Sequence, residues 1–470
     1  MKRFNLITGT VMALAITTGT VQAQQFVDKK QTDVHVMSKT YTWPQDQAVL
    51  QKLDQWQDLK FGVLFHWGLY SVKGINESWP LCSEERFLKR RKSIQPQMNY
   101  EEFKQWYWGQ INNFNPTEFN PEEWADIMKD AGMKYVVFTT KHHDGFCMFD
   151  TQTTSFSIAH GPFSNNPKKD VAYHVFDAFR KKDFMIGAYF SKPDWHCEYY
   201  WNSDMATPDR NVNYQIKLHK EWWRKFQEYT ARQIDELTTR YGQIDILWLD
   251  GGQVRPDNGQ DIHLDRIIDK ARQKQPGMLA VDRTVPGRNE NYATPEMRIP
   301  STQLNYPWES NLQLANGWGW RKNSIYKSPQ TIINNLIEIT AKGGALLLGV
   351  GPTPQGTIEE KAAICLRQVG EWLKSYGKAI YATRITPHYN DGNVWFTTSK
   401  DHKTLYALYA LPEGETLPST ITWKGNEPKG AIRLIKGNRK VKHTCKNGII
   451  TVELPKELKN EPIAFYYNRK

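Results

Sequence analysis

Between residues 61 and 376 the chain alternates short apolar runs with longer segments of helical periodicity. The expected strands are Phe61–Trp67, Tyr135–Thr140, Phe184–Phe190, Ile244–Asp250, Met278–Asp282 and Ala345–Val350. The expected helices are 121–131, 171–182, about 213–241, 264–274, 329–341 and 358–376. Strands that are apolar throughout are typical of parallel sheets covered on both faces. Over roughly 330 residues this order predicts an α/β fold, a (β/α)8-like TIM barrel, in preference to an open sheet.

The pattern changes after Gly377. Short strands punctuated by Gly, Asn, Asp and Pro are expected at Val394–Thr398, Leu405–Ala410, Ala431–Ile435, Ile449–Val452 and Ile463–Tyr467. No long helical pattern lies between them, which is typical of an antiparallel β-sandwich. We therefore expect a barrel domain at 40–376 and a C-terminal β-sandwich domain at 377–470.

The N-terminus has the features of an export signal. Lys2 and Arg3 precede the apolar stretch Phe4–Ile16, and Val21-Gln22-Ala23 offers a small-residue cleavage site. We expect residues 1–23 to be a cleavable signal peptide and the mature protein to be secreted or periplasmic. No later run approaches the roughly 18 apolar residues of a membrane span, so no membrane insertion is expected.

Composition narrows the range of partners. Five cysteines without CxxC spacing exclude a disulfide scaffold and disfavour a zinc finger. The formal net charge of +11 favours acidic partners such as sulfated glycans, whereas export and the lack of a basic–aromatic motif argue against nucleic acid. The 18 Trp and 22 Tyr suit a carbohydrate ligand, because aromatic rings pack flat against sugar rings.

Polar side chains gather where the expected strands end. In a parallel barrel, functional residues project from the carboxyl ends of the strands. These ends carry His66, the run Lys141–Asp144 with His142 and His143, Tyr189, Trp248 with Asp250, and Asp282 with Arg283. A single polar strand end is ordinary, but five such ends in one barrel predict a functional site.

The histidines raise the question of a metal. A barrel metal site usually has His-x-His on one strand, whereas His142 and His143 are adjacent, and their side chains diverge unless the strand has already ended. No HExxH helix and no phosphate-binding motif are present, so we expect no metal and no cofactor. Carboxylates with His, Arg and Trp suit glycoside cleavage instead. In that chemistry Asp250 would be the ionised carboxylate, with a second carboxyl about 5 Å away for retention of configuration.

Four segments are similar to signature segments of glycoside hydrolase family 29, the α-L-fucosidases: Phe61–Gly68, Tyr135–Phe146, Asp245–Gly251 and Leu346–Pro352. Segments 370–374 and 379–381 resemble that family's junction between barrel and sandwich, and the similarity spans about residues 45 to 470. The resemblance implies an exo-acting enzyme without a cofactor. Such an enzyme hydrolyses terminal α-L-fucosyl linkages of oligosaccharides or polysaccharides by double displacement with retention.

The resemblance also implies residue roles, with Asp250 as the nucleophile. Around the sugar it implies His66, His142 and His143 at the hydroxyls, Tyr189 and Trp248 beside the nucleophile, Arg283, and Trp318 at the C6 methyl. Fucose is a 6-deoxy sugar with one apolar corner, so polar groups on one side and an aromatic ring on the other suit it.

Two glutamates compete for the role of acid/base. Glu296 lies on a loop like the one that supplies this group in several family members, and we expect it to hold the role. Its rival is Glu309, which begins the next recognisable family segment. The structural alternative for Glu309 is a buried carboxylate that orients a pocket histidine, and for Glu296 an exposed loop charge.

Two other functions stay open at this point. One is an α-L-galactosidase of the same family acting on a sulfated galactan, because L-galactose differs from L-fucose only by a hydroxyl on C6. The other is a catalytically inactive sugar-binding homologue. The long excursion Trp79–Gly109, with its basic run Lys89–Lys92, suits leaving-group subsites, a positive rim for an acidic glycan, or a solvated basic helix face with a few anchoring aromatic residues.

Overall fold

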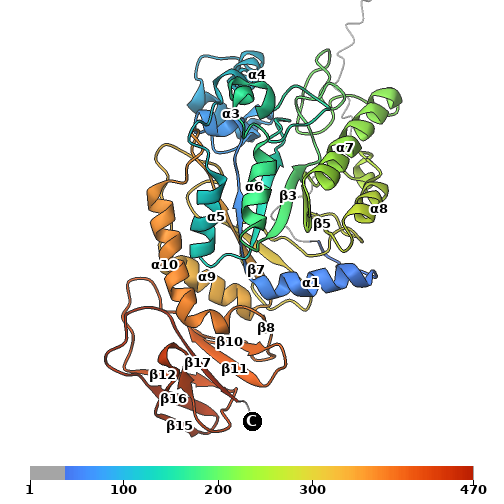
Figure 1. The fold of residues 1–470 in the computed structure, drawn as a ribbon. Helices are drawn as coiled ribbons and strands as arrows, with labels where there is room; N and C mark the ends of the chain where they lie inside the picture. The colour runs from blue at the N-terminus through green and yellow to red at the C-terminus, as the bar shows by residue number, and fades with distance from the viewer. Residues whose placement is uncertain (1–37, 469–470) are drawn as a thin grey trace, which may run out of the picture.

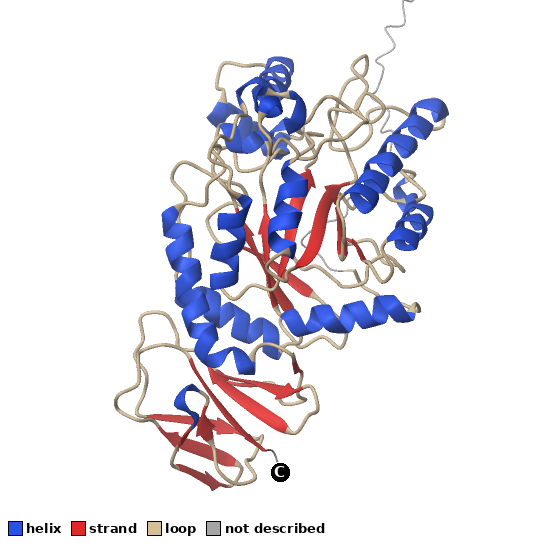
Figure 2. Cartoon of the chain, viewed as in Figure 1, coloured by secondary structure: helices blue, strands red, loops and turns tan. Residues whose placement is uncertain are grey.

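The computed structural model describes residues 38–468, and its core is a curled parallel sheet (Figures 1 and 2). The strands are β1 (Phe61–Phe65), β2 (Tyr135–Lys141), β3 (Met185–Ser191), β4 (Ile246–Asp250), β5 (Leu279–Asp282), β6 (Glu309–Gln313) and β7 (Ala345–Val350). Their order is β5-β4-β3-β2-β1-β7-β6. The predicted barrel is confirmed, and β6 is a strand that the sequence analysis missed.

Helices cover the outside of this sheet: α5 (Pro121–Asp130), α6 (Val171–Arg180), α7 (Lys220–Arg240), α8 (Leu264–Lys274), α9 (Pro329–Ala341) and α10 (Glu360–Tyr376). Helix α1 (Gln47–Leu59) instead closes one end of the barrel, where its Val49, Leu53 and Trp56 join the interior cluster, and the single turn α2 (Leu69–Val72) follows the carboxyl end of β1. The expected start of α7 near residue 213 is wrong. The Asn213 amide instead bonds the backbone of Asn202 and Met205, which keeps this stretch in a loop.

The barrel interior follows the two-residue period of the strands. Alternate side chains point inward and form their own buried cluster, which includes Leu64, Tyr135, Val137, Tyr189, Ile246, Trp248, Leu279, Val281 and Leu347. Gly62 leaves room for this filling, because a Cβ there would lie 2.5 Å from the Tyr135 ring. The same alternation carries His66, Asp250 and Arg283 inward at the strand ends.

An irregular segment, residues 290–297, completes the barrel between β5 and β6. Its Asn291 N–H donates to the Ala280 carbonyl of β5 (2.9 Å), and the Asn291 side-chain oxygen accepts from the Ala280 N–H (2.8 Å). On the other side Ala293 and Glu296 pair in parallel with Trp308 and Asn311. The segment therefore takes the place of an eighth strand, and Glu296 lies at its carboxyl end.

The C-terminal region consists of antiparallel sheets. One sheet contains β8 (Thr383–Arg384), β9 (Asn390–Asp391), β10 (Val394–Ser399), β11 (Thr404–Tyr409), β13 (Arg433–Leu434), β14 (Arg439–Lys440) and β17 (Ile463–Asn468). The other contains β12 (Thr420–Lys424), β15 (His443–Lys446) and β16 (Ile449–Glu453). The predicted sandwich is confirmed, with more strands than the five expected.

The two ends of the barrel carry different structures. Figure 1 shows the C-terminal sheets beside α9 and α10, at the end of the barrel opposite α3 (Glu85–Ile94) and α4 (Tyr100–Trp108). The Trp372 indole of α10 donates to the Pro462 carbonyl (2.7 Å) across this junction. Among the described helices, none is both long and apolar enough to cross a membrane. The expected signal peptide lies outside the described residues.

The hydrogen bonds of residues 290–297, called the closing segment below, lead to a prediction about stability. Asn291→Ala should lower the free energy of unfolding by about 2–4 kcal/mol, because it removes the acceptor of the buried Ala280 N–H and the contact with Arg272. Chemical unfolding measures this change. Asn112→Ala, at an exposed asparagine, is the control and should stay within about 0.5 kcal/mol of wild type. Equal effects of the two substitutions would contradict the role given to residues 290–297.

Candidate active site

A tight pocket lies at the carboxyl ends of the barrel strands. Its lining residues are His66, Glu77, Trp79, His142, Tyr189, Asp250, Arg283, Glu296, Asn311 and Trp318. Side chains that the sequence places up to about 250 residues apart thus meet in one place, as the strand-end argument requires. Of the residues expected in the site, only His143, Trp248 and Glu309 are not part of this lining.

Asp250 ends β4 and is held by three donors. The Tyr189 hydroxyl donates to Oδ2 (2.6 Å), and the Gly251 N–H and Arg283 Nη1 both donate to Oδ1 (2.8 Å each). Burial alone would raise the pKa of Asp250, but the Arg283 guanidinium, with help from His143 and Tyr189, outweighs it and holds the pKa well below its usual range. Asp250 is therefore an ionised carboxylate in a nearly closed pocket.

Arg283 connects the two carboxyl groups of the pocket. Its Nη1 donates to Asp250, its Nη2 donates to Glu296 Oε2 (2.6 Å), and its guanidinium lies 4.5 Å from the Trp248 ring. Burial would lower the pKa of Arg283, but the two carboxylates raise it above its ordinary value. One rigid cation thus fixes Asp250 and Glu296 side by side.

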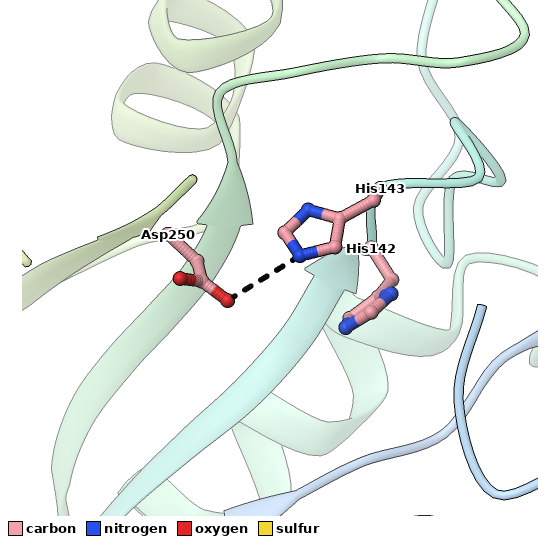
Figure 3. A group of neighbouring side chains, drawn as sticks. All are labelled: His142, His143 and Asp250. Atoms are coloured by element: carbon pink, nitrogen blue, oxygen red, sulfur yellow. Dashed lines mark ion pairs between the residues drawn. The ribbon is translucent and has the colours of Figure 1, made fainter. Parts of the chain in front are cut away.

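Histidines form the other wall: His66 and His142 line it, and His143 lies directly behind them, next to Asp250 (Figure 3 shows His142, His143 and Asp250). His142 Nδ1 and the Ser78 hydroxyl are 2.5 Å apart, and His143 Nε2 lies 3.7 Å from Asp250 Oδ2. Burial lowers the pKa of His66 to about 3, that of His143 to about 4 and that of His142 well below its ordinary value. Neutral imidazoles both donate and accept, which suits hydroxyl ligands. The Nδ1 atoms of His66 and His143 are buried and accept or donate no hydrogen bond within the described chain.

The two competing glutamates occupy different places. Glu296 lines the pocket and bonds Arg283, which also bonds Asp250. Glu309 is fully buried below the pocket and accepts from Tyr135 (2.8 Å) and Trp248 (3.1 Å). Burial raises the pKa of Glu309 to about 7. Its bonds go to aromatic residues and Asn311, so it does not orient a histidine as the structural alternative supposed.

Three pocket residues escaped the sequence analysis as site members. Glu77 and Trp79 come from the excursion after β1, where Trp79 lies edge-on to His143 with ring centroids 4.9 Å apart. Arg90, from the basic run, donates to Glu77 (3.1 Å), so this run is partly a support of the pocket. Asn311 lies two residues after Glu309 on β6, and the alternation of side chains would have placed both inside the barrel if this strand had been recognised.

The group His142, His143 and Asp250 has the composition of a metal site. One ligand atom from each lies within 4.8 Å of the others. However, Arg283 and Tyr189 already occupy the Asp250 oxygens, and a guanidinium 2.8 Å from the carboxylate repels a metal cation. The donors therefore fit a hydrogen-bonded sugar better than an ion.

Comparisons with known proteins identify the family. The alpha-L-fucosidase family model matches residues 29–378. Plasma alpha-L-fucosidase of Homo sapiens is 29% identical over 391 residues, 78% of each chain, and the Branchiostoma floridae alpha-L-fucosidase is 25% identical over 89% of this chain and 92% of its own. The structure of alpha-L-fucosidase isoenzyme 1 from Paenibacillus thiaminolyticus has a TM-score of 0.75 at 26% identity, covering 90% of this chain and 100% of its own. The chain therefore belongs to the α-L-fucosidase family, glycoside hydrolase family 29.

Proposed function

We propose that the protein is an exported, retaining exo-α-L-fucosidase with Asp250 as nucleophile and Glu296 as acid/base. The observation that carries this assignment is the guanidinium of Arg283, which bonds one oxygen of each carboxylate at 2.8 and 2.6 Å. Retention requires two carboxyl groups about 5–5.5 Å apart. Two carboxylates bound to the two terminal nitrogens of one guanidinium lie close together, which supports a retaining arrangement.

The two acids take different roles in the proposed chemistry. Asp250 attacks the anomeric carbon while Glu296 gives its proton to the departing glycosidic oxygen, and the C–O bond breaks. Glu296 then takes a proton from water, the water oxygen attacks the same carbon, and Asp250 leaves as a carboxylate. Arg283 keeps Asp250 ionised for the first step, and the bond from Tyr189 fixes which oxygen faces the sugar.

The pocket walls suit L-fucose. The neutral histidines face one side, where ring hydroxyls need donors and acceptors. Trp318 lies next to them, packed against His66 with ring centroids 5.4 Å apart, and offers an apolar ring face where a methyl fits. Asp250 is only 7% exposed at the bottom of the pocket, which supports cleavage of a terminal residue rather than attack within a chain.

The substrate and compartment complete the proposal. The substrate is the fucosylated end of an oligosaccharide or polysaccharide, and the net charge of +11 favours a sulfated or otherwise acidic one. Export rests on the signal-like features of residues 1–23. N-terminal sequencing of protein recovered outside the cytoplasm should give Gln24 as the first residue, and recovery of the intact N-terminus from the cytoplasm would contradict export.

Substitution of the two glutamates tests the acid/base. Glu296→Ala should lower kcat/KM on a natural fucosyl disaccharide by about 10²–10⁴-fold. It should lower the rate far less on an activated aryl α-L-fucoside, whose leaving group needs no proton. Azide should restore turnover of the aryl substrate and give the α-fucosyl azide, because azide attacks the fucosyl-enzyme without a base.

The matched control is Glu309→Gln, which keeps the shape of the buried group. It should lower activity on both substrates by similar factors, without azide rescue. Production of α-fucosyl azide by the Glu309 variant alone would transfer the acid/base role to Glu309 and leave the fucosidase activity in place.

The electrostatic support of Asp250 gives a pH prediction. Removing the guanidinium with Arg283→Met removes the largest of the groups that oppose burial, so the pKa of Asp250 rises and the carboxylate is protonated at higher pH. The acid limb of the kcat/KM profile should then move up by about 1–3 pH units, whereas Arg283→Lys, which keeps the charge, should move it less. Profiles normalised to each variant's own maximum measure this. An acid limb unchanged in Arg283→Met would contradict the role of Arg283.

A further inference from the structure

One polar atom of the pocket has no partner and no place in the chemistry above. The Asn311 side chain is 1% exposed, and its Oδ1 accepts no hydrogen bond within the described part of the chain. A buried amide oxygen without a donor costs about 1–3 kcal/mol. In a ligand pocket such an atom indicates a donor that arrives with the ligand.

The orientation of the Asn311 amide is fixed from below. Its Nδ2 donates to Glu309 Oε1 (2.9 Å), and Glu309 is itself held by Tyr135 and Trp248. Because Nδ2 takes the side of the amide that faces Glu309, Oδ1 points away from Glu309. The backbone of Asn311 is equally fixed, because its N–H and C=O bond Pro295 and Met297 beside Glu296. Asn311 is thus a rigid acceptor in the pocket lining.

The order of the strands tells which part of the sugar faces Asn311. From Asp250 on β4 the sheet runs through β3, β2 and β1 to β7 and β6, and the closing segment and β5 return to Asp250. The histidines follow β2 and end β1, and Trp318 and Asn311 belong to the β7–β6 side.

The atoms of a pyranose ring bound in the pocket can be placed in order along the same sequence of strands. The proposed function places C1 at Asp250 and the hydroxyls on C2, C3 and C4 at the histidines, and this fixes the direction in which the ring atoms run. C5 with its substituent C6 comes next, and the ring oxygen completes the circuit on the side of Arg283. The C6 substituent therefore lies between His66 and Arg283, where Trp318 and Asn311 are.

From this placement we propose that Asn311 is a specificity-determining residue whose Oδ1 accepts a hydrogen bond from a hydroxyl on C6. The enzyme then cleaves terminal α-L-galactosides as well as α-L-fucosides. Trp318 packs against the carbon of C6 in both sugars, and Asn311 distinguishes the hydroxymethyl group from the methyl group. The inference rests on the proposed function, since it uses Asp250 to place C1.

Three aryl glycosides test the inference: the α-L-fucoside, the α-L-galactoside and the 6-deoxy-6-fluoro-α-L-galactoside. Fluorine is close to a hydroxyl in size but cannot donate, so it separates hydrogen bonding from space. The wild type should cleave the galactoside with a kcat/KM within about tenfold of the fucoside, and the fluoro compound more slowly than the galactoside. Rejection of the galactoside by about a thousandfold or more would overturn the inference while the fucosidase activity stands.

Two variants assign the effect to one side chain. Asn311→Leu, of nearly equal shape, should lower the galactoside-to-fucoside ratio of kcat/KM by about 10–100-fold. Gln313→Met, a similar exchange on the same strand outside the pocket lining, should leave the ratio unchanged. An unchanged ratio in Asn311→Leu would mean that Oδ1 meets only a buried water, and the inference would fail.

Calorimetry with the free monosaccharides gives a readout that needs no turnover. Wild-type protein should bind L-galactose at least as tightly as L-fucose, and 6-deoxy-6-fluoro-L-galactose more weakly than L-galactose. Asn311→Leu should reverse the preference in favour of L-fucose. Preference of the wild type for L-fucose would overturn the inference, whereas absence of binding and cleavage for both sugars would overturn the proposed function itself.

Discussion

Arg283 is the side chain on which the geometry of the pocket depends. Two carboxylates placed close together repel each other, and a buried carboxylate tends to take up a proton. A guanidinium presents two parallel N–H groups in a fixed plane, so it can hold both acids at once. Here it bonds Asp250 and Glu296 while lying over the Trp248 ring, and the low pKa of Asp250 follows from it. A lysine could supply the charge but not the spacing.

The barrel places these groups because its wall is complete. Asp250 ends the regular strand β4 and Arg283 directly follows β5, but Glu296 lies on the irregular segment 290–297, whose position depends on hydrogen bonds to β5 and β6. Asn291 of the segment bonds Ala280 of β5, and the backbone of Asn311 on β6 bonds Pro295 and Met297 of the segment. The bonds that close the barrel also fix the second carboxyl group at its distance from the first.

Much of this arrangement could be predicted from sequence. The apolar strands give the barrel, and a side-chain period of two gives the inward direction of His66, Asp250 and Arg283. What could not be predicted depends on the tertiary path of the chain. Strand β6 reads Glu-Ser-Asn-Leu-Gln, which has neither the apolar run nor the β-branched residues of a buried strand, so Asn311 went unrecognised. Glu77 and Trp79 reach the pocket only because the excursion after β1 folds back over it.

The central claim is that a covalent bond forms between Asp250 and the sugar. The most direct test is to incubate the enzyme with 2-deoxy-2-fluoro-α-L-fucosyl fluoride, which forms the glycosyl-enzyme readily and loses it slowly, and to map the adduct by mass spectrometry of peptides. The account predicts one fluorofucosyl group, located on Asp250 in the peptide that contains Trp248, and an α-configured product when the natural substrate is hydrolysed. An adduct on Glu296 or Glu309, or a β-configured product without any adduct, would contradict it.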